Sequence, residues 1–444
     1  MFTVIGNAWA LLLGMMFLMV GNGMQGTLMG VRGALEGFTT LDLSLITSAY
    51  FLGFLGGSRL APDFIRRVGH VRVFAALGSL VSAALILYPA ITNPYVWIAL
   101  RILVGFCFSG LYVTAESWLN NAATNDTRGQ TLSVYMMVQM FGIIAAQGLL
   151  NVADPGGWML FVIPSVLVSI SFAPILLSVA PTPSFDSTKS MGLLELYRQS
   201  PLGFVGMFLL GSVFAAQFGM SAVYATQIGM SVGQISIFIS AIFVGAMLLQ
   251  YPIGFLSDRM DRRVLIIGVA MVGALAAALG WVFAGQFWAL CLSAFVLGGM
   301  SNPLYALLIA YTNDYLEPDD MAAASGGFVF INGLGAVGGP VMIGWIMTEF
   351  GPGGFWSVII VLMLAIAAYG GYRMTRRESA YVAEAEAYEP TPYAPVTSAG
   401  MAIAAEVAQD FYSDLDGDED ENWSAGEDWD GAAEPDAGAE RDHP

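Results

Sequence analysis

The chain has 444 residues, of which 57% are apolar or aromatic (AVILMFWYC) and only 11% are charged. A soluble domain carries about 25% charged residues, so a soluble fold is excluded for most of this chain. The acids are concentrated at the end: residues 379–444 hold 18 Asp and Glu against one base, Arg441, and account for almost all of the net charge of −18. The rest of the chain has no basic patch of the kind that binds nucleic acid.

Residues that carry metal, redox or nucleotide chemistry are scarce. Cys107 and Cys291 each lie inside an apolar run and indicate no disulfide framework. The only histidines, His70 and His443, give no material for a metal site or a catalytic triad. The single lysine, Lys189, follows a threonine where a nucleotide-binding P-loop needs glycine. We therefore expect no metal, no cofactor, no enzymatic activity and no ATP-driven pump.

Before the acidic end, the chain is a succession of apolar runs. A helix that crosses a bilayer needs about 20 mostly apolar residues, and twelve such runs occur. They are continuous rather than alternating in hydropathy, which favours helices over the strands of a barrel. In chain order we expect the twelve transmembrane helices near 4–31, 41–61, 71–90, 95–120, 129–150, 158–178, 202–227, 232–256, 263–283, 287–313, 321–347 and 354–373.

The basic residues between these runs predict the orientation. Loops that follow even-numbered helices, together with the central connection and the flank after the last helix, carry twelve of them: Arg66, Arg67, Arg72, Arg128, Lys189, Arg198, Arg259, Arg262, Arg263, Arg373, Arg376 and Arg377. The loops on the other side offer only Arg32. Because basic loops stay in the cytoplasm, both termini are expected to be cytoplasmic.

The two halves of the apolar region repeat each other. Ser48–Gly53 matches Ser240–Gly245 at an offset of 192 residues, and Leu111-Tyr112 matches Leu304-Tyr305 at 193. A duplication predicts two pseudo-symmetric six-helix bundles with a site between them. We expect an N-terminal bundle over 1–180, a cytoplasmic linker over 181–200, a C-terminal bundle over 201–378, and a disordered acidic cytoplasmic tail over 379–444.

A charged loop follows the eighth predicted helix. It carries a Gly-x-x-x-Asp-Arg-x-x-Arg-Arg pattern formed by Gly254, Asp258, Arg259, Arg262 and Arg263. Gly254 would allow close helix approach, and Asp258 can pair with an arginine and latch this face shut; an ordinary basic loop is the alternative. The equivalent loop of the first half keeps Arg67 and Gly69 but has Arg66 where the second half has its carboxylate. Asp63 or Glu116 could take that place.

Polar residues inside the predicted helices mark a candidate binding site. Arg101 lies about 9 Å into the fourth helix, and Gly105, Phe108, Tyr112 and Glu116 follow on the same helix face. We expect Arg101 to bind a solute or to couple its movement, an interhelical anchor being the alternative. Glu116 is expected in a gate rather than as a proton carrier. The other expected cavity residues are Asn22, Gln25, Tyr112 and Gln227.

These patterns resemble a known family. The loop Gly254–Arg263 is similar to the signature loop of the major facilitator superfamily, and Arg101–Gly105 resembles its R-x-x-x-G motif. The stretches 22–32, 111–120 and 123–129 look like the bacterial YcaD-like branch. The resemblance implies the major facilitator fold and a multi-pass permease of the bacterial inner membrane. The acidic tail is not part of the family pattern.

We therefore expect a secondary active transporter of a small organic solute that works by alternating access, is coupled to protons, and favours efflux slightly over uptake. Arg101 would bind an anionic group or sense the protonation of a carboxylate. The expected partners are the solute, protons and membrane lipid, with no nucleic acid, and the chain is expected to be a monomer. The alternative is a non-transporting sensor or scaffold on the same fold that signals through the acidic tail.

Overall fold

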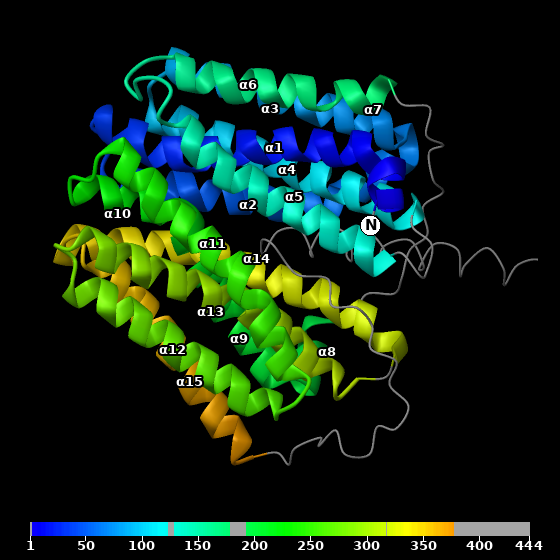
Figure 1. The fold of residues 1–444 in the computed structure, drawn as a ribbon, viewed down its shortest axis with the longest axis vertical. Coiled ribbons are helices and arrows are strands. Elements are labelled where there is room, and N and C mark those ends of the chain that lie inside the picture. The colour runs from blue at the N-terminus through cyan, green and yellow to red at the C-terminus, as the bar shows by residue number, and fades with distance from the viewer. Residues whose placement is uncertain (1, 123–127, 178–191, 317, 377–444) are drawn as a thin grey trace, which may run out of the picture.

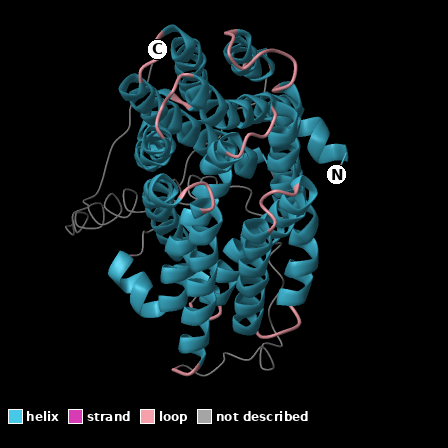
Figure 2. Cartoon of the chain, turned by 90° about the vertical axis from the view of Figure 1, so that its left-hand side faces the viewer, coloured by secondary structure: helices cyan, strands magenta, loops and turns pink. Residues whose placement is uncertain are grey.

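The computed structural model describes residues 2–122, 128–177, 192–316 and 318–376. Within these ranges the chain forms helices joined by short loops, and no strand occurs there (Figure 2). The all-helical membrane fold expected from the sequence is confirmed. The predicted acidic tail and most of the predicted linker lie outside the described residues.

The N-terminal half contains seven helical segments in the described ranges. They are α1 (Phe2–Leu35), α2 (Thr40–Val68), α3 (His70–Ala90), α4 (Pro94–Ala122), α5 (Arg128–Leu149), α6 (Met159–Ser171) and α7 (Ala173–Leu177). The sixth predicted helix is thus divided in two after Ser171. Pro174 explains the break, because proline lacks an N–H group and its ring collides with the carbonyl four residues earlier.

The C-terminal half begins within the predicted linker, where α8 (Leu193–Gln199) forms a short helix. The remaining elements are α9 (Pro201–Ala215), the π-helical turn η1 (Ala216–Met220), α10 (Ser221–Gln227), α11 (Val232–Ser257), α12 (Arg262–Val282), α13 (Phe287–Asn313), α14 (Pro318–Phe350) and α15 (Gly354–Met374). The seventh predicted helix is therefore continuous through α9, η1 and α10, with one wider turn in its middle. The Ser221 N–H donates to the Ala216 carbonyl, five residues back, in that turn.

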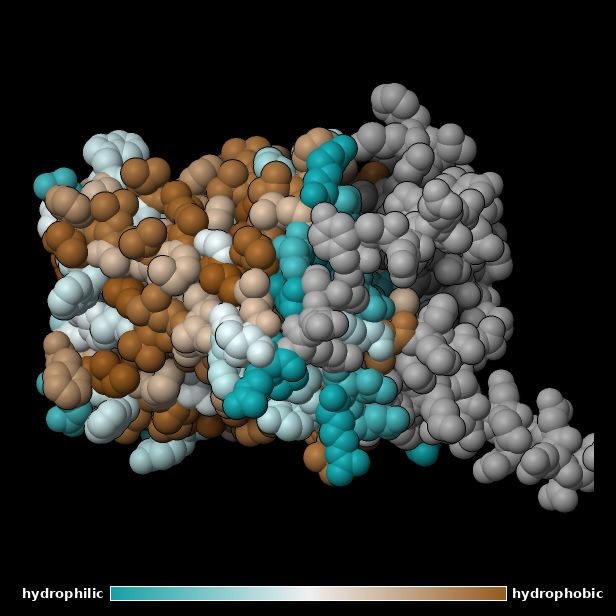
Figure 3. All heavy atoms as spheres, turned by 90° about the horizontal axis from the view of Figure 1, so that it is seen from below, coloured by the Kyte–Doolittle hydropathy of each residue, from teal (hydrophilic) through white to brown (hydrophobic). Residues whose placement is uncertain are grey.

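Eleven stretches of the described helices are long and apolar enough to cross a bilayer. The described part of α5 adds a shorter apolar helix, Val134–Leu149. Figure 3 shows apolar side chains spread over the visible face of the C-terminal half, with polar side chains gathered toward one end. This pattern is what a helix bundle in lipid requires.

The internal repeat is visible in the backbone. Gly37 has a φ of 77° and precedes the capping box in which Thr39 and Asp42 exchange hydrogen bonds at the start of α2. The same arrangement recurs 192 residues later. Gly229 has a φ of 78°, and Ser231 and Gln234 form the capping box of α11. The second helix of each half thus begins with the same turn and cap, as a duplication predicts.

The helices form two bundles that lie one above the other in Figure 1, with the N-terminal half in blue to cyan and the C-terminal half in green to orange. Inside the first bundle α1 packs on α5 and α6, and α2 packs on α4; inside the second, α9 packs on α14 and α11 on α13. The bundles meet where α2 contacts α14, α5 contacts α11, and α1 contacts α10.

The hydrogen bonds between the bundles lie toward one end of the molecule. We call the end at which α1 begins and α15 ends the terminal face, and the other end of the helices the opposite face. Among the described residues, three hydrogen bonds join the bundles on the side of the opposite face: Asn151 Nδ2 to Ser236 Oγ (3.0 Å), Gln227 Nε2 to Thr40 Oγ1 (2.6 Å), and Ser48 Oγ to the Val337 carbonyl.

Glycines bring the two bundles into close contact on this side. A Cβ added at Gly344 in α14 would lie 2.3 Å from the Cβ of Ser44 in α2, and one added at Gly30 in α1 would lie 2.8 Å from the Cβ of Ala222 in α10. Carbon atoms pack best at about 3.5–4.0 Å, so no larger residue fits at either position without moving a helix. We call this set of contacts the opposite-face seal.

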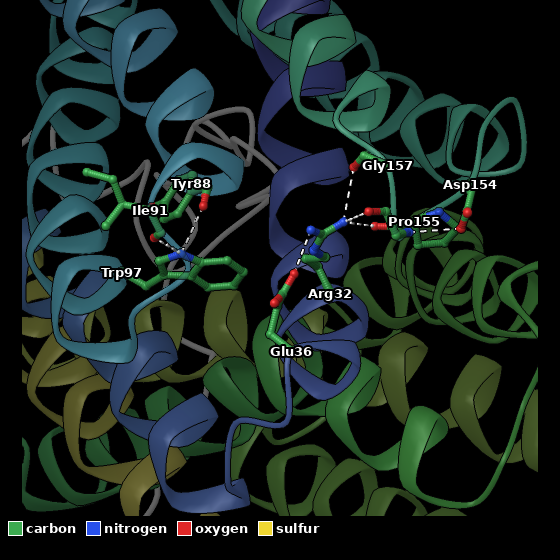
Figure 4. A network of polar contacts seen from close by, with 9 residues as sticks. Arg32, Glu36, Tyr88, Ile91, Trp97, Asp154, Pro155 and Gly157 are labelled. Atoms are coloured by element: carbon green, nitrogen blue, oxygen red, sulfur yellow. Dashed lines mark hydrogen bonds and ion pairs between the residues drawn. The ribbon is translucent and has the colours of Figure 1, made fainter.

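Arg32 anchors a loop at the same face (Figure 4). Its guanidinium donates to the carbonyls of Pro155, Gly156 and Gly157, in the loop between α5 and α6, and forms an ion pair with Glu36 at 2.5 Å. The loop also contains Asn151, which bonds across to α11. Arg32 therefore fixes the backbone next to one contact of the opposite-face seal.

Candidate functional site

A cavity of about 70 Å³ lies between the two bundles. Its wall from the N-terminal half comes from α1, α2, α4 and α5, and its wall from the C-terminal half comes from η1 and α11. The first wall consists of Asn22, Gly23, Gln25, Gly26, Thr27, Thr47, Tyr50, Phe51, Phe54, Arg101, Tyr112, Ile143 and Gln147, and the second of Phe218, Gly219, Ile239 and Phe243.

A hydrogen-bond network runs along the first wall. Arg101 Nη1 donates to Gln25 Oε1 (2.5 Å), and Gln25 Nε2 donates to Asn22 Oδ1 (2.9 Å). Asn22 Nδ2 then donates to the Tyr112 hydroxyl (2.9 Å), while the Tyr50 hydroxyl donates to Asn22 Oδ1 (3.3 Å). Asn22 and Gln25 are three residues apart in α1 and so share a helix face. The network holds three helices in one arrangement around the cavity.

Arg101 is the charged member of this network. It lies seven residues after the first residue of α4, about 10 Å along the helix, and only 4% of its surface is exposed. Its Nε also donates to the Ile46 carbonyl (3.4 Å), and its guanidinium carbon lies 4.7 Å from the centre of the Tyr50 ring. A guanidinium has five N–H donors, so donors remain for a ligand in the cavity.

The positive charge of Arg101 is only partly balanced. Its neighbours include an amide, a carbonyl, the aromatic face of Tyr50 and the phenol of Tyr88, none of which carries a full negative charge. Across the ranges that the structure describes, no Asp or Glu forms an ion pair with Arg101. An arginine inside a membrane helix costs about 2.5–3.5 kcal/mol on insertion scales, and an opposite charge lowers the energy of a buried ion. The site is therefore complementary to an anion.

The second wall has a different character. Phe218, Ile239 and Phe243 present apolar side chains to the cavity, and the rings of Phe218 and Phe243 lie 5.1 Å apart. Gln217, next to Phe218 in η1, is buried and donates to the Ser301 hydroxyl at 2.8 Å. The Gln217 side chain thus bonds inside its own bundle, and the Phe218 ring lines the cavity.

The structure brings together four of the five residues expected at the site. Asn22, Gln25, Arg101 and Tyr112 line the cavity and belong to one network, although their role in binding stays a prediction. Gln227 lies outside the cavity, at the end of α10, where it is exposed and bonds to Thr40.

Sequence reasoning missed several cavity residues. Thr47, Tyr50, Phe51 and Phe54 line the cavity from α2 at steps of three and four residues. That spacing marks one helix face, but in an apolar run it is also the spacing of ordinary core packing. Thr27 and Gln147 were missed as a pair; the Thr27 hydroxyl donates to Gln147 Oε1 at 3.0 Å. The polar residues among them were the available signal.

The predicted latch residues form contacts within their own halves. Arg262 pairs with Asp314 at the end of α13, Arg263 pairs with Asp261 at 2.8 Å, and Arg259 stacks on Phe255 at 3.4 Å. Asp258 and Arg67 are exposed. A Cβ added at Gly254 would meet nothing within 4 Å, so no close helix approach occurs there in this arrangement.

Asp63 and Glu116, the two acids considered for the first-half latch, lie in different environments. Asp63 pairs with Arg66 at 3.1 Å near the end of α2. Glu116 is buried in α4, with only 3% of its surface exposed, and interacts with Tyr135 of α5. In the part of the chain that is described, no group of three or more His, Cys, Asp or Glu side chains could hold a metal ion.

Known proteins are similar to this chain in sequence and in fold. The YcaD transporter of Escherichia coli O6:K15:H31 (strain 536), an uncharacterized MFS-type transporter, is 26% identical over 345 residues, which cover 77% of this chain and 88% of that protein. The crystal structure of a mutant of the nucleoside transporter NupG has a TM-score of 0.69 at 15% identity and covers 83% of this chain and 99% of its own.

A bacterial homologue of the human lysosomal transporter Spinster, solved in an inward-facing and unoccupied conformation, has a TM-score of 0.63 at 15% identity and covers 84% of this chain and 95% of its own. The sequence profile of the Major Facilitator Superfamily matches residues 11–231 and 202–408. The two matches overlap and together span most of the chain, in agreement with two bundles around a central cavity. The chain belongs to the major facilitator superfamily, in the branch of the YcaD-type transporters.

Proposed function

We propose that this protein is a proton-coupled secondary transporter that moves a small organic anion across the bacterial inner membrane by alternating access, with efflux as the favoured direction. The observation that carries the proposal is Arg101. It is a buried cation on a cavity between two bundles, and the groups around it are neutral. The charge of a bound anion would complete this site.

The opposite-face seal supports alternating access. The bundles are joined on one side of the cavity by hydrogen bonds and by close glycine contacts. A rigid movement of one bundle away from the other would break these contacts together. With both termini in the cytoplasm, as the basic loops predict, the seal closes the outer side. The latch loop Gly254–Arg263, now bonded within its own half, would engage the other bundle when the inner side closes.

Proton coupling and direction form the second part of the proposal. Glu116 lies four residues after Tyr112 and so on the same face of α4 as the polar network. The sequence pattern alone placed Glu116 in a gate, but its burial and this position on the helix support a proton site that communicates with the cavity through Tyr112. An inside-negative membrane potential drives each negative charge outward with about 2.3 kcal/mol per 100 mV, which favours export of an anion.

A binding screen tests the anion site. The full-length protein in lipid nanodiscs would be heated with carboxylates, sulfonates, amino acids, sugars, nucleosides and organic cations, at two pH values. A ligand present at 100 times its Kd stabilises the folded protein by about 2.7 kcal/mol. We expect anions to raise the melting temperature of the wild type and of Arg66→Gln, whose arginine is exposed, but not that of Arg101→Gln.

The opposite result would refute the anion site. If a neutral or cationic solute stabilises the wild type and Arg101→Gln equally, while anions stabilise neither, Arg101 is a structural anchor. Transport is tested separately in proteoliposomes with a hit from the screen. Glu116→Gln should abolish the response to an imposed pH gradient but retain exchange of labelled for unlabelled solute, and retention of the pH response would remove Glu116 from the mechanism.

A further inference from the structure

The two walls of the cavity differ in chemistry, and the difference follows the boundary between the bundles. Among the residues that the structure describes, every polar side chain that lines the cavity comes from the N-terminal half, including Asn22, Gln25 and Arg101. The C-terminal half contributes Phe218, Gly219, Ile239 and Phe243 within the described ranges. A solute between the bundles therefore meets polar groups beside Phe51, Phe54 and Ile143 on one side, and only hydrocarbon on the other.

The apolar wall is a built feature of the fold. Phe218 and Gly219 belong to the π-helical turn η1, and such turns are frequent at functional sites. The neighbouring Gln217 is directed to Ser301, with which it exchanges hydrogen bonds of 2.8 and 3.2 Å. The Phe218 and Phe243 rings are inclined by 58° to each other, so they form an angled aromatic surface.

This asymmetry limits the solutes that fit. A sugar or a hydroxy acid would leave hydroxyl groups against Phe218 and Phe243 without partners, and a buried polar group without a partner is unfavourable. A hydrocarbon or aromatic body would fit that wall, while its charged group stays at Arg101. No second Lys or Arg lines the cavity among the described residues, so a dianion would keep one charge unbalanced.

We propose that the cavity selects amphipathic monoanions, in which a single carboxylate binds Arg101 on the N-terminal bundle and an apolar body packs on Phe218 and Phe243 of the C-terminal bundle. This inference rests on the proposed anion transporter and names the substrate class of its site. Charge is recognised by one bundle and the apolar body by the other. The small volume of the cavity favours compact members of the class.

A matched set of small solutes tests the proposal by direct binding to the full-length protein in nanodiscs, with empty nanodiscs to subtract lipid partitioning. Pentanoate is the reference. Glycerate has the same number of heavy atoms and one carboxylate but a polar body; succinate adds a second charge; pentanamide removes the charge. Each buried methylene contributes about a fourfold gain in affinity, so we expect pentanoate to bind at least tenfold more tightly than glycerate, and also more tightly than succinate and pentanamide.

Two variants separate the two walls. Phe243→Ala should weaken pentanoate at least fivefold and leave glycerate within twofold, whereas Arg101→Gln should weaken both acids and remove the advantage of pentanoate over pentanamide. Phe243→Leu keeps an apolar wall and should bind pentanoate nearly as well as the wild type, which guards against a folding defect in the alanine variant. Melting temperatures of the unliganded variants serve as the folding control.

The outcomes distinguish the inference from the function on which it rests. If glycerate or succinate binds as tightly as pentanoate and Arg101→Gln abolishes both, the amphipathic selectivity is wrong and the anion transporter stands. If pentanamide binds as tightly as pentanoate to the wild type and to Arg101→Gln, the anion site itself is wrong. If Phe243→Ala weakens glycerate and pentanoate equally, the apolar wall is structural and the proposed selectivity is overturned.

Discussion

Gly344→Ala should open the opposite-face seal. The added Cβ would lie 2.3 Å from Ser44 Cβ and 2.4 Å from Ser44 Oγ, so α2 and α14 must move apart by about 1.2 Å to reach the 3.5 Å of an ordinary carbon contact. Overpacking of this kind costs about 1–3 kcal/mol. A free-energy change of about 1–3 kcal/mol alters the ratio of the sealed to the open state by about 5–150-fold. The cost falls on the sealed arrangement, because the two helices separate when the seal opens.

The assay follows the seal at a distance from the substitution. Asn151→Cys and Ser236→Cys replace a hydrogen-bonded pair that joins the loop after α5 to α11, on the other edge of the contact between the bundles. The native Cys107 and Cys291 are both buried. A short bifunctional thiol reagent should link the introduced pair rapidly in the parent protein, and Gly344→Ala should lower the rate by at least fivefold.

Gly338→Ala is the matched control. It lies in the same helix, and an added Cβ there would meet nothing within 4 Å. We expect this variant to cross-link like the parent protein. Equal rates in Gly344→Ala and the parent, or equal slowing by both alanines, would show that the glycine contact does not hold the bundles together.

Three further predictions concern other parts of the molecule. Arg32→Gln removes the donors to the carbonyls of Pro155, Gly156 and Gly157; hydrogen exchange in residues 150–158 should rise at least tenfold, with no change in α12, and an unchanged rate would refute the anchoring role. Burial raises the pKa of the Asp314 carboxyl, and Arg262 opposes the rise. The folded state therefore holds the carboxyl proton more tightly than the unfolded chain does. As a result, the protein loses stability as the pH rises through the pKa of the folded state. Thermal unfolding between pH 4 and 7 should therefore show a larger loss with rising pH in the wild type than in Asp314→Asn, and parallel curves would exclude this carboxyl as a source. Deletion of residues 380–444 should leave anion binding and transport within twofold of the full chain, whereas their loss would favour the sensor alternative.

The sequence predicted the helices well because a membrane makes the hydrophobic requirement strict. Continuous apolar runs identified the helices, and the repeat offset of 192 residues reappears in the matching turns at Gly37 and Gly229. The break before α7 could have been predicted from Pro174 but was missed. The turn η1 could not be predicted, because Ala216–Met220 has no residue that demands a wider turn. The packing of neighbouring helices decides its geometry.

The site was predictable where polar residues interrupt apolar helices. Asn22, Gln25 and Arg101 stand out for this reason, and a bilayer forces such side chains together because lipid offers no partners. Gln227 was placed in the cavity because a sequence does not give the depth of a residue near a helix end. Tyr50 was missed because an aromatic residue in an apolar run looks like packing, although its ring faces Arg101 at 4.7 Å.

The division of the cavity between the two bundles has a consequence for how such a protein can change over generations. Because the polar wall and the apolar wall are encoded in different halves of a duplicated gene, a substitution at Ile239 or Phe243 alters one wall and leaves the network around Arg101 intact. The apolar wall can then change through substitutions in the second half while the first half keeps Arg101. A chimera that joins residues 1–200 of this chain to the second half of a relative would inherit the first property and exchange the second.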